Sequence, residues 1–188
     1  IAGRRFNLVL PFGCTASGAL ESRGAMRWSF DPKTETLRIA VDPTTWRQGQ
    51  WNGAASGKDK SAWRGFWVAR PWSTATSCTD PRQAPVDDVS EPFASPVGQT
   101  FAIARMIENE PVDNKRSYET VQRVTPTGFD PEQGFRLRLV GRVISGAGDM
   151  PIHCIQPGGS DHPPRCMIAV TFNEVRIENP KDGAVLAS

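Results

Sequence analysis

Two histidines and two cysteines lie close together in the sequence and could do chemistry. His153 and Cys154 come just before a loop rich in Pro and Gly, and His162 and Cys166 lie at its far end. These nitrogen and sulfur donors are the types that zinc prefers. Adjacent ligands at 153 and 154 would point to opposite faces of a strand, however, and an oxidising compartment converts such thiols to a disulfide. We therefore expect no metal here but a hairpin stapled by a disulfide.

The chain has four cysteines, an even number that predicts two disulfides. Because the short loop favours the local bond between Cys154 and Cys166, we expect the other bond between Cys14 and Cys78. Disulfides persist in oxidising compartments. The absence of any Asn-x-Ser/Thr sequon favours a bacterial envelope over a eukaryotic secretory route. We expect a periplasmic protein, with an extracellular location as the alternative.

Six tryptophans form the second signal, all between positions 28 and 72. The stretch from 46 to 63 combines indole rings with Gly, Gln, Asn and basic residues. Exposed indole faces stack on the C–H faces of sugars, and Trp and Arg are also enriched at protein interfaces. The stretch therefore predicts a surface that recognises a glycan or a protein, made by Trp46, Arg47, Trp51, Lys58 and Trp63.

The alternative is that the tryptophans fill the hydrophobic core. This alternative is strongest for Trp28 and Trp67, which lie in strand-like segments. It also applies to Trp46 and Trp51.

The sequence gives only weak signs of a catalytic site. There is no Gly-x-Ser-x-Gly elbow, and His162 lies beside prolines in the loop, so we expect no nucleophile triad. Two carboxylates could act together in glycoside hydrolysis, but the sequence does not give their separation. The candidates for such a pair are Asp87, Asp88, Glu91, Glu108, Glu110 and Glu119. We expect no cofactor and no catalytic residue.

The composition is that of a globular protein. The 188 residues carry a formal net charge of only +2, which gives no strong attraction to nucleic acid. No run of 18 apolar residues is present, so no transmembrane helix is expected. The first residues lack the charged and apolar regions of a signal peptide, so an exported chain would have lost its signal already. The sequence does not indicate an oligomeric state.

Short segments with alternating apolar and polar residues predict strands throughout the chain. Even spacing of prolines leaves little room for helices, and the best helix candidate is the short stretch 113–116. In the clearest strand we expect Leu137 and Leu139 inside and Arg136 and Arg138 outside. The last strand is long enough to be bent or bulged. The predicted strands are 5–10, 26–30, 36–41, 64–69, 100–107, 118–124, 135–144 and 166–177.

These segments predict an all-β fold, a single antiparallel β-sandwich or open barrel of about nine or ten strands stapled by disulfides. We expect one domain over residues 1–188, with a Pro-rich connector at 79–99. The functional expectation is an exported domain of the bacterial envelope that binds a protein partner or a glycan without catalysis. The alternative is a hydrolase acting on polysaccharide or peptidoglycan through paired carboxylates.

Overall fold

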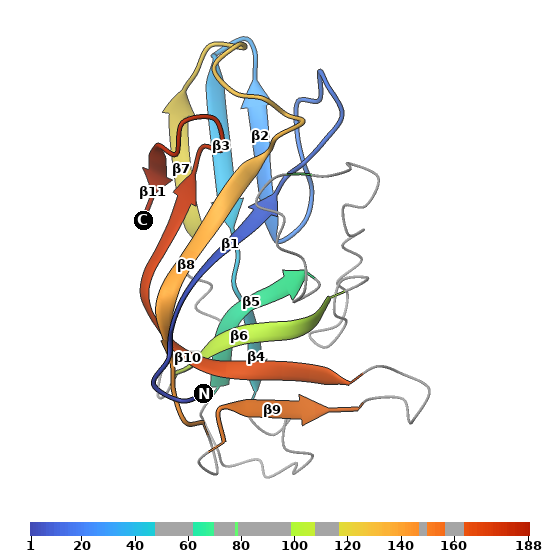
Figure 1. Cartoon of the computed structure of the whole chain (residues 1–188). Helices are drawn as coiled ribbons and strands as arrows, with labels where there is room; N and C mark the ends of the chain where they lie inside the picture. Colours follow the sequence, from blue (N-terminus) through green and yellow to red (C-terminus); the bar gives the residue numbers. More distant parts are fainter. Residues whose placement is uncertain (48–61, 70–77, 79–98, 108–116, 147–149, 157–163) are drawn as a thin grey trace.

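The computed structural model describes residues 1–47, 62–69, 78, 99–107, 117–146, 150–156 and 164–188 (Figure 1). These residues form strands and no helix, so none of the described chain is a helix that could cross a membrane. The strands are β1 (Arg5–Phe12), β2 (Met26–Asp31), β3 (Thr36–Val41), β4 (Thr44–Arg47), β5 (Ala62–Ala69), β6 (Gln99–Ile107), β7 (Tyr118–Arg123), β8 (Phe135–Val143), β9 (Ile152–Ile155), β10 (Arg165–Glu178) and β11 (Val185–Ala187).

The described strands form two sheets, which confirms the all-β, sandwich-like architecture. The larger sheet has eight strands in the order β1-β8-β10-β6-β5-β4, with β9 and β11 also pairing with β10. The smaller sheet has the order β2-β3-β7. The larger sheet is open, since β1 and β4 end its strand order, so the fold is not a closed barrel.

Strand β10 joins the two parts of the larger sheet. Its first half pairs with β6 and β9, and its second half pairs with β8 and β11. The register shifts between Phe172 and Glu174, where a bulge lets the strand bend (Figure 1). The bulged strand predicted from the sequence is therefore confirmed. The pairing of β10 with β6 is parallel, which the prediction of purely antiparallel pairing missed.

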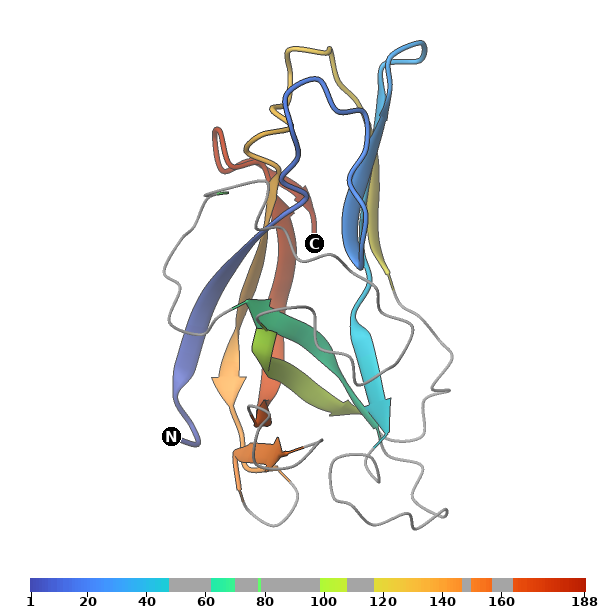
Figure 2. The ribbon, with the colours of Figure 1, turned by 90° about the vertical axis from the view of Figure 1, so that its right-hand side faces the viewer.

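The main core lies between the two sheets. Figure 2 shows β1, β8 and β10 as one layer and β2, β3 and β7 as the facing layer, with β5 and β6 crossing lower down. Leu137 and Leu139 are fully buried in this core, as predicted, while Arg136 and Arg138 lie half-buried on the other face of β8. The facing sheet contributes Trp28, Ile39 and their neighbours to the same core.

A second hydrophobic cluster contains most of the described tryptophans. Trp46, Trp63 and Trp67 pack with Met167 and Ala169. In β5, Trp63 and Trp67 occupy one set of alternate positions, while Phe66 and Val68 occupy the other and belong to the main core. Because alternate side chains of a strand point to opposite faces, the second cluster lies on the face of β5 that points away from the main core.

Both predicted disulfides are confirmed. Cys14 pairs with Cys78, and the two Cα atoms are 5.8 Å apart. Cys154 of β9 pairs with Cys166 of β10, with a Cα–Cα distance of 4.0 Å. These last two cysteines are direct partners in the antiparallel register, so this bond staples the hairpin as expected.

All eight predicted strands are present, with small differences at their ends. The prediction missed β4, β9 and β11, which have only three or four residues each. The helix candidate at 113–116 lies outside the described residues. So does the predicted connector, except for Gln99, which begins β6.

Candidate functional site

Two of the predicted binding tryptophans lie in the core. Trp46 of β4 and Trp63 of β5 are direct cross-strand partners and are 0% and 2% exposed. The ring of Trp46 also meets that of Trp67 edge to face, with centroids 5.4 Å apart. The expectation of exposed indole faces is therefore wrong for Trp46 and Trp63. The reason is strand β4, which puts Trp46 in a sheet instead of a loop.

The other predicted binding residues do not complete a surface in the described chain. Arg47 is exposed at the end of β4. Trp51 and Lys58 lie outside the described residues. Of the two histidines, His162 also lies outside them, and His153 packs against Trp63 with ring centroids 6.1 Å apart. No group of three His, Cys, Asp or Glu side chains that could hold a metal occurs in the described part of the chain.

A cleft of about 550 Å³ opens beside the corner where the chain passes from the smaller sheet to the larger one. At this corner β3 ends at Val41 and β4 begins at Thr44, so Asp42 and Pro43 link the two sheets. The volume of this cleft is within the usual range of small-molecule sites. The residues that line it are Pro43, Arg64, Gly65, Phe66, Arg105, Ser117, Tyr118, Glu119 and Phe172.

Two arginines stand side by side in the cleft wall. Arg64 of β5 and Arg105 of β6 are direct partners in the antiparallel register, so both side chains point to one face of the sheet. Arg64 is only 3% exposed. Its Nε donates to the Oγ1 of Thr45 at 3.4 Å, and both arginines have further contacts within the protein. The sheet register thus brings two fixed positive charges together at the cleft.

Hydrogen bonds of Asp42 hold the rim of the cleft. Its Oδ1 accepts from the hydroxyl of Ser117 at 2.6 Å, and its Oδ2 is 2.5 Å from the guanidinium of Arg27. The backbone N–H of Asp42 donates to the carbonyl of Ala25 at 2.7 Å. These bonds tie the corner to the starts of β7 and β2, so they position Tyr118, the residue after Ser117.

Aromatic rings form the apolar part of the wall. Phe66 lies near Tyr118 and Phe172, with ring centroids 6.3 and 5.9 Å apart. Tyr118 and Phe172 are half-buried, and Tyr118 is the one tyrosine of the sequence. The cleft therefore combines ring faces, hydroxyl groups and positive charge.

Carboxylates are scarce in this cleft. Among the described residues that line it, Glu119 is the one carboxylate. Asp42 at the rim is held by Arg27 and Ser117. Of the carboxylates named as candidates for a hydrolase, Glu119 lines the cleft. The other five lie outside the described residues.

A smaller hollow of about 360 Å³ lies on the outer face of the smaller sheet. Arg27 and Arg38 line it together with Glu21 and Glu119, so its formal charges balance. Val121 beside them is 55% exposed. This hollow is thus less suited to an anion than the cleft between the sheets.

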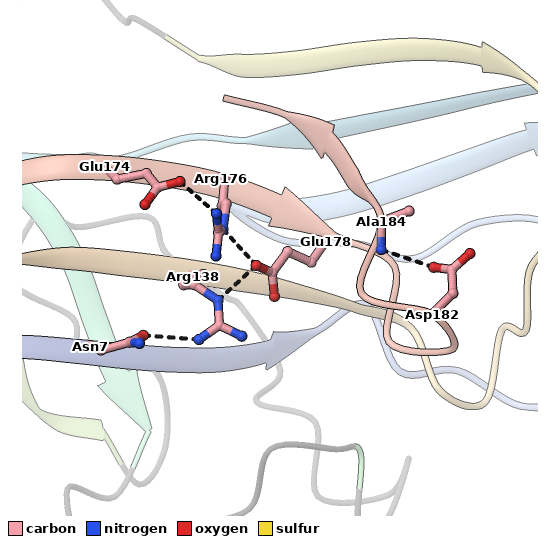
Figure 3. Close-up of polar contacts among 7 residues, drawn as sticks. All are labelled: Asn7, Arg138, Glu174, Arg176, Glu178, Asp182 and Ala184. Carbon is pink, nitrogen blue, oxygen red and sulfur yellow. Dashed lines mark hydrogen bonds and ion pairs between the residues drawn. The ribbon is translucent and has the colours of Figure 1, made fainter.

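A second group of charges lies on the outer face of the larger sheet (Figure 3). Glu178 is 3% exposed and accepts from the Nε of Arg138 at 2.7 Å, while the Nε of Arg176 lies 2.6 Å away. Arg138 also donates to Asn7, and Arg176 to Glu174. The hydrogen bond from Arg138 is the main reason that the pKa of Glu178 lies below its usual range. Because these charges satisfy one another across β1, β8 and β10, they stabilise the sheet.

Comparison of the chain with models of protein families, with curated proteins and with solved structures gave no match.

Sequence reasoning missed the cleft, although a signal was present. Arg64 has the same parity as Phe66 and Val68 in β5, and Arg105 has the same parity as Ile103 in β6. In both strands an arginine occupies a position of the alternating pattern that is otherwise apolar and faces the interior. A charged residue at such a position is a candidate for binding, because charged side chains are seldom buried without a partner.

Proposed function

We propose that the protein is an exported domain of the bacterial envelope that binds a glycan in the cleft between its two sheets and does not catalyse a reaction. The observation that carries the proposal is the pairing of Arg64 with Arg105 in a wall that also holds Tyr118 and Phe172. Aromatic rings stack on sugar rings, and arginines and hydroxyl groups bond the polar substituents.

The two disulfides support the proposal that the protein is exported. Bonds such as Cys14–Cys78 and Cys154–Cys166 persist in a periplasm or outside the cell and are rare in a reducing cytoplasm. The envelope offers peptidoglycan, surface polysaccharides and other envelope proteins as partners. A protein partner is the second candidate, because tyrosine and arginine, which line the cleft, are also enriched at protein interfaces.

Replacing Tyr118 with Ala is expected to weaken glycan binding at least tenfold, about 1.4 kcal/mol, because the variant loses the ring and hydroxyl group that line the cleft. The binding partner is first selected from peptidoglycan fragments and surface oligosaccharides, and its affinity is then measured by calorimetry. Tyr118→Phe is the matched control, because it keeps the ring and should keep most of the affinity.

Incubation of the same glycan with the protein should release no new reducing ends, since a binding domain leaves its ligand intact. Equal affinity of Tyr118→Ala and the unmodified protein would contradict the proposed cleft. New reducing ends that depend on Glu119 would contradict the absence of catalysis.

A further inference from the structure

We infer that Arg64 and Arg105 bind the carboxylate of an acidic sugar, so that the ligand of the cleft is a glycan containing uronic acid or an equivalent carboxylated residue. This inference rests on the proposed glycan-binding function and names the class of glycan.

The register of the sheet supplies the geometry. Arg64 and Arg105 are directly opposite each other on β5 and β6. The Cβ atoms of such a pair are about 5 Å apart. One anion in the cleft can therefore contact both guanidinium groups. A planar carboxylate matches the forked donors of arginine and accepts two parallel hydrogen bonds from one guanidinium.

The surroundings favour a charged ligand. Arg64 is nearly buried, and charge-assisted hydrogen bonds are stronger where water is excluded. Both arginines keep their contacts within the protein, including that of Arg64 with Thr45, and these contacts hold the side chains in place. The described lining carries two arginines and one glutamate, so its formal charge is positive.

The other lining residues favour a sugar over an acidic peptide. Tyr118 and Phe172 are half-buried rings beside the arginines. One residue of an acidic sugar presents a C–H face for a ring and a carboxylate for an arginine at the same time. The hydroxyl group of Tyr118 suits the ring hydroxyls of the same residue.

The test compares three probes on the full chain by calorimetry. Trigalacturonate carries the carboxylates, its methyl ester has the same sugar rings without charge, and hexaglutamate carries carboxylates without sugar. We expect trigalacturonate to bind at least tenfold more tightly than the ester and than hexaglutamate. Arg105→Gln should remove this preference for the acid over the ester. Arg38→Gln, which removes the same charge from the outer hollow, should keep it.

The outcomes separate the inference from the function on which it rests. Equal binding of acid and ester would overturn the inference and leave the glycan-binding cleft intact. If a folded protein binds a peptidoglycan fragment or surface oligosaccharide but neither galacturonate, the inference is overturned and the proposed function stands. If it binds none of these glycans, both are contradicted. If hexaglutamate binds as tightly as trigalacturonate, the inference of an acidic sugar is overturned, and the ligand is an acidic protein segment. Loss of the preference in Arg38→Gln but not in Arg105→Gln would place the site in the outer hollow and so overturn the inference.

Arg105→Lys tests the same inference if Arg105→Gln does not fold. The lysine retains the positive charge and lacks the forked donors of arginine. We expect it to weaken trigalacturonate binding several-fold while leaving binding of the ester unchanged. An unchanged affinity for both ligands would contradict a role for the guanidinium group.

Discussion

Replacing Trp28 with Ala is expected to destabilise the protein by about 3 to 5 kcal/mol, the usual cost of truncating a buried aromatic residue. Trp28 is 1% exposed, and its Nε1 donates to the carbonyl of Gly13 at 2.6 Å. Its ring meets Phe129 and Phe135 edge to face, with centroids 5.3 and 6.4 Å away. The substitution therefore removes a hydrogen bond and leaves a cavity between the two sheets.

Urea unfolding with intact disulfides measures this effect. Val121→Ala is the matched control, because Val121 lies on the exposed face of the same small sheet and its truncation should cost no more than about 0.5 kcal/mol. Trp28→Phe should fall between the two, since it keeps a ring but loses the bond to Gly13. A loss below about 1 kcal/mol for Trp28→Ala would contradict the packing between the sheets.

The second large effect is expected for Glu178→Gln, with a loss of about 2 to 3 kcal/mol at neutral pH. Removing one partner of a buried ion pair costs about 3 to 5 kcal/mol, and partial exposure of the two arginines reduces that cost here. Arg138 and Arg176 are direct partners in the register of β8 and β10. Without the negative charge of Glu178 between them, two positive charges face each other.

The stability lost in Glu178→Gln should depend on pH. The pKa of Glu178 is lower in the folded state than its usual value, mainly because of the hydrogen bond from Arg138. A carboxylate of this kind contributes its full stability above its unfolded pKa of about 4.3 and loses it as the pH falls through the folded pKa. The difference between the unmodified protein and Glu178→Gln should therefore be full at neutral pH and shrink below about pH 4.

Urea unfolding of both proteins over this pH range provides the test. Glu174→Gln serves as the control, since Glu174 pairs with Arg176 at a more exposed position and its neutralisation should cost less than about 1 kcal/mol. A destabilisation by Glu178→Gln that stays constant down to acidic pH would show that its charge is not the cause.

The sequence was sufficient to predict the elements with strong alternation. In β8 the apolar residues Phe135, Leu137 and Leu139 share one face and arginines the other, and the structure has the same arrangement. The disulfide between Cys154 and Cys166 followed from the short loop that separates them. These predictions succeeded because the responsible forces act within a strand or a hairpin.

Features that depend on distant parts of the chain could not be predicted. Trp46 lies in a strand of four residues, too short for a clear alternation, and it is buried because β4 pairs with β5. The parallel pairing of β6 with β10 joins segments that lie more than 60 residues apart, such as Phe101 and Cys166. The cleft arises from the same long-range contacts, since Arg64, Arg105 and Tyr118 come from three strands in two sheets.

The central claim is that the ligand binds in the cleft between the two sheets, and fluorine NMR of protein labelled with 3-fluorotyrosine tests it most directly. Tyr118 is the one tyrosine of the chain and lines the cleft, so the labelled protein should give one resonance from this position. Titration with trigalacturonate should shift that resonance in a saturable manner, with the dissociation constant measured by calorimetry. A resonance that stays unchanged while calorimetry shows binding would place the ligand elsewhere and contradict the account.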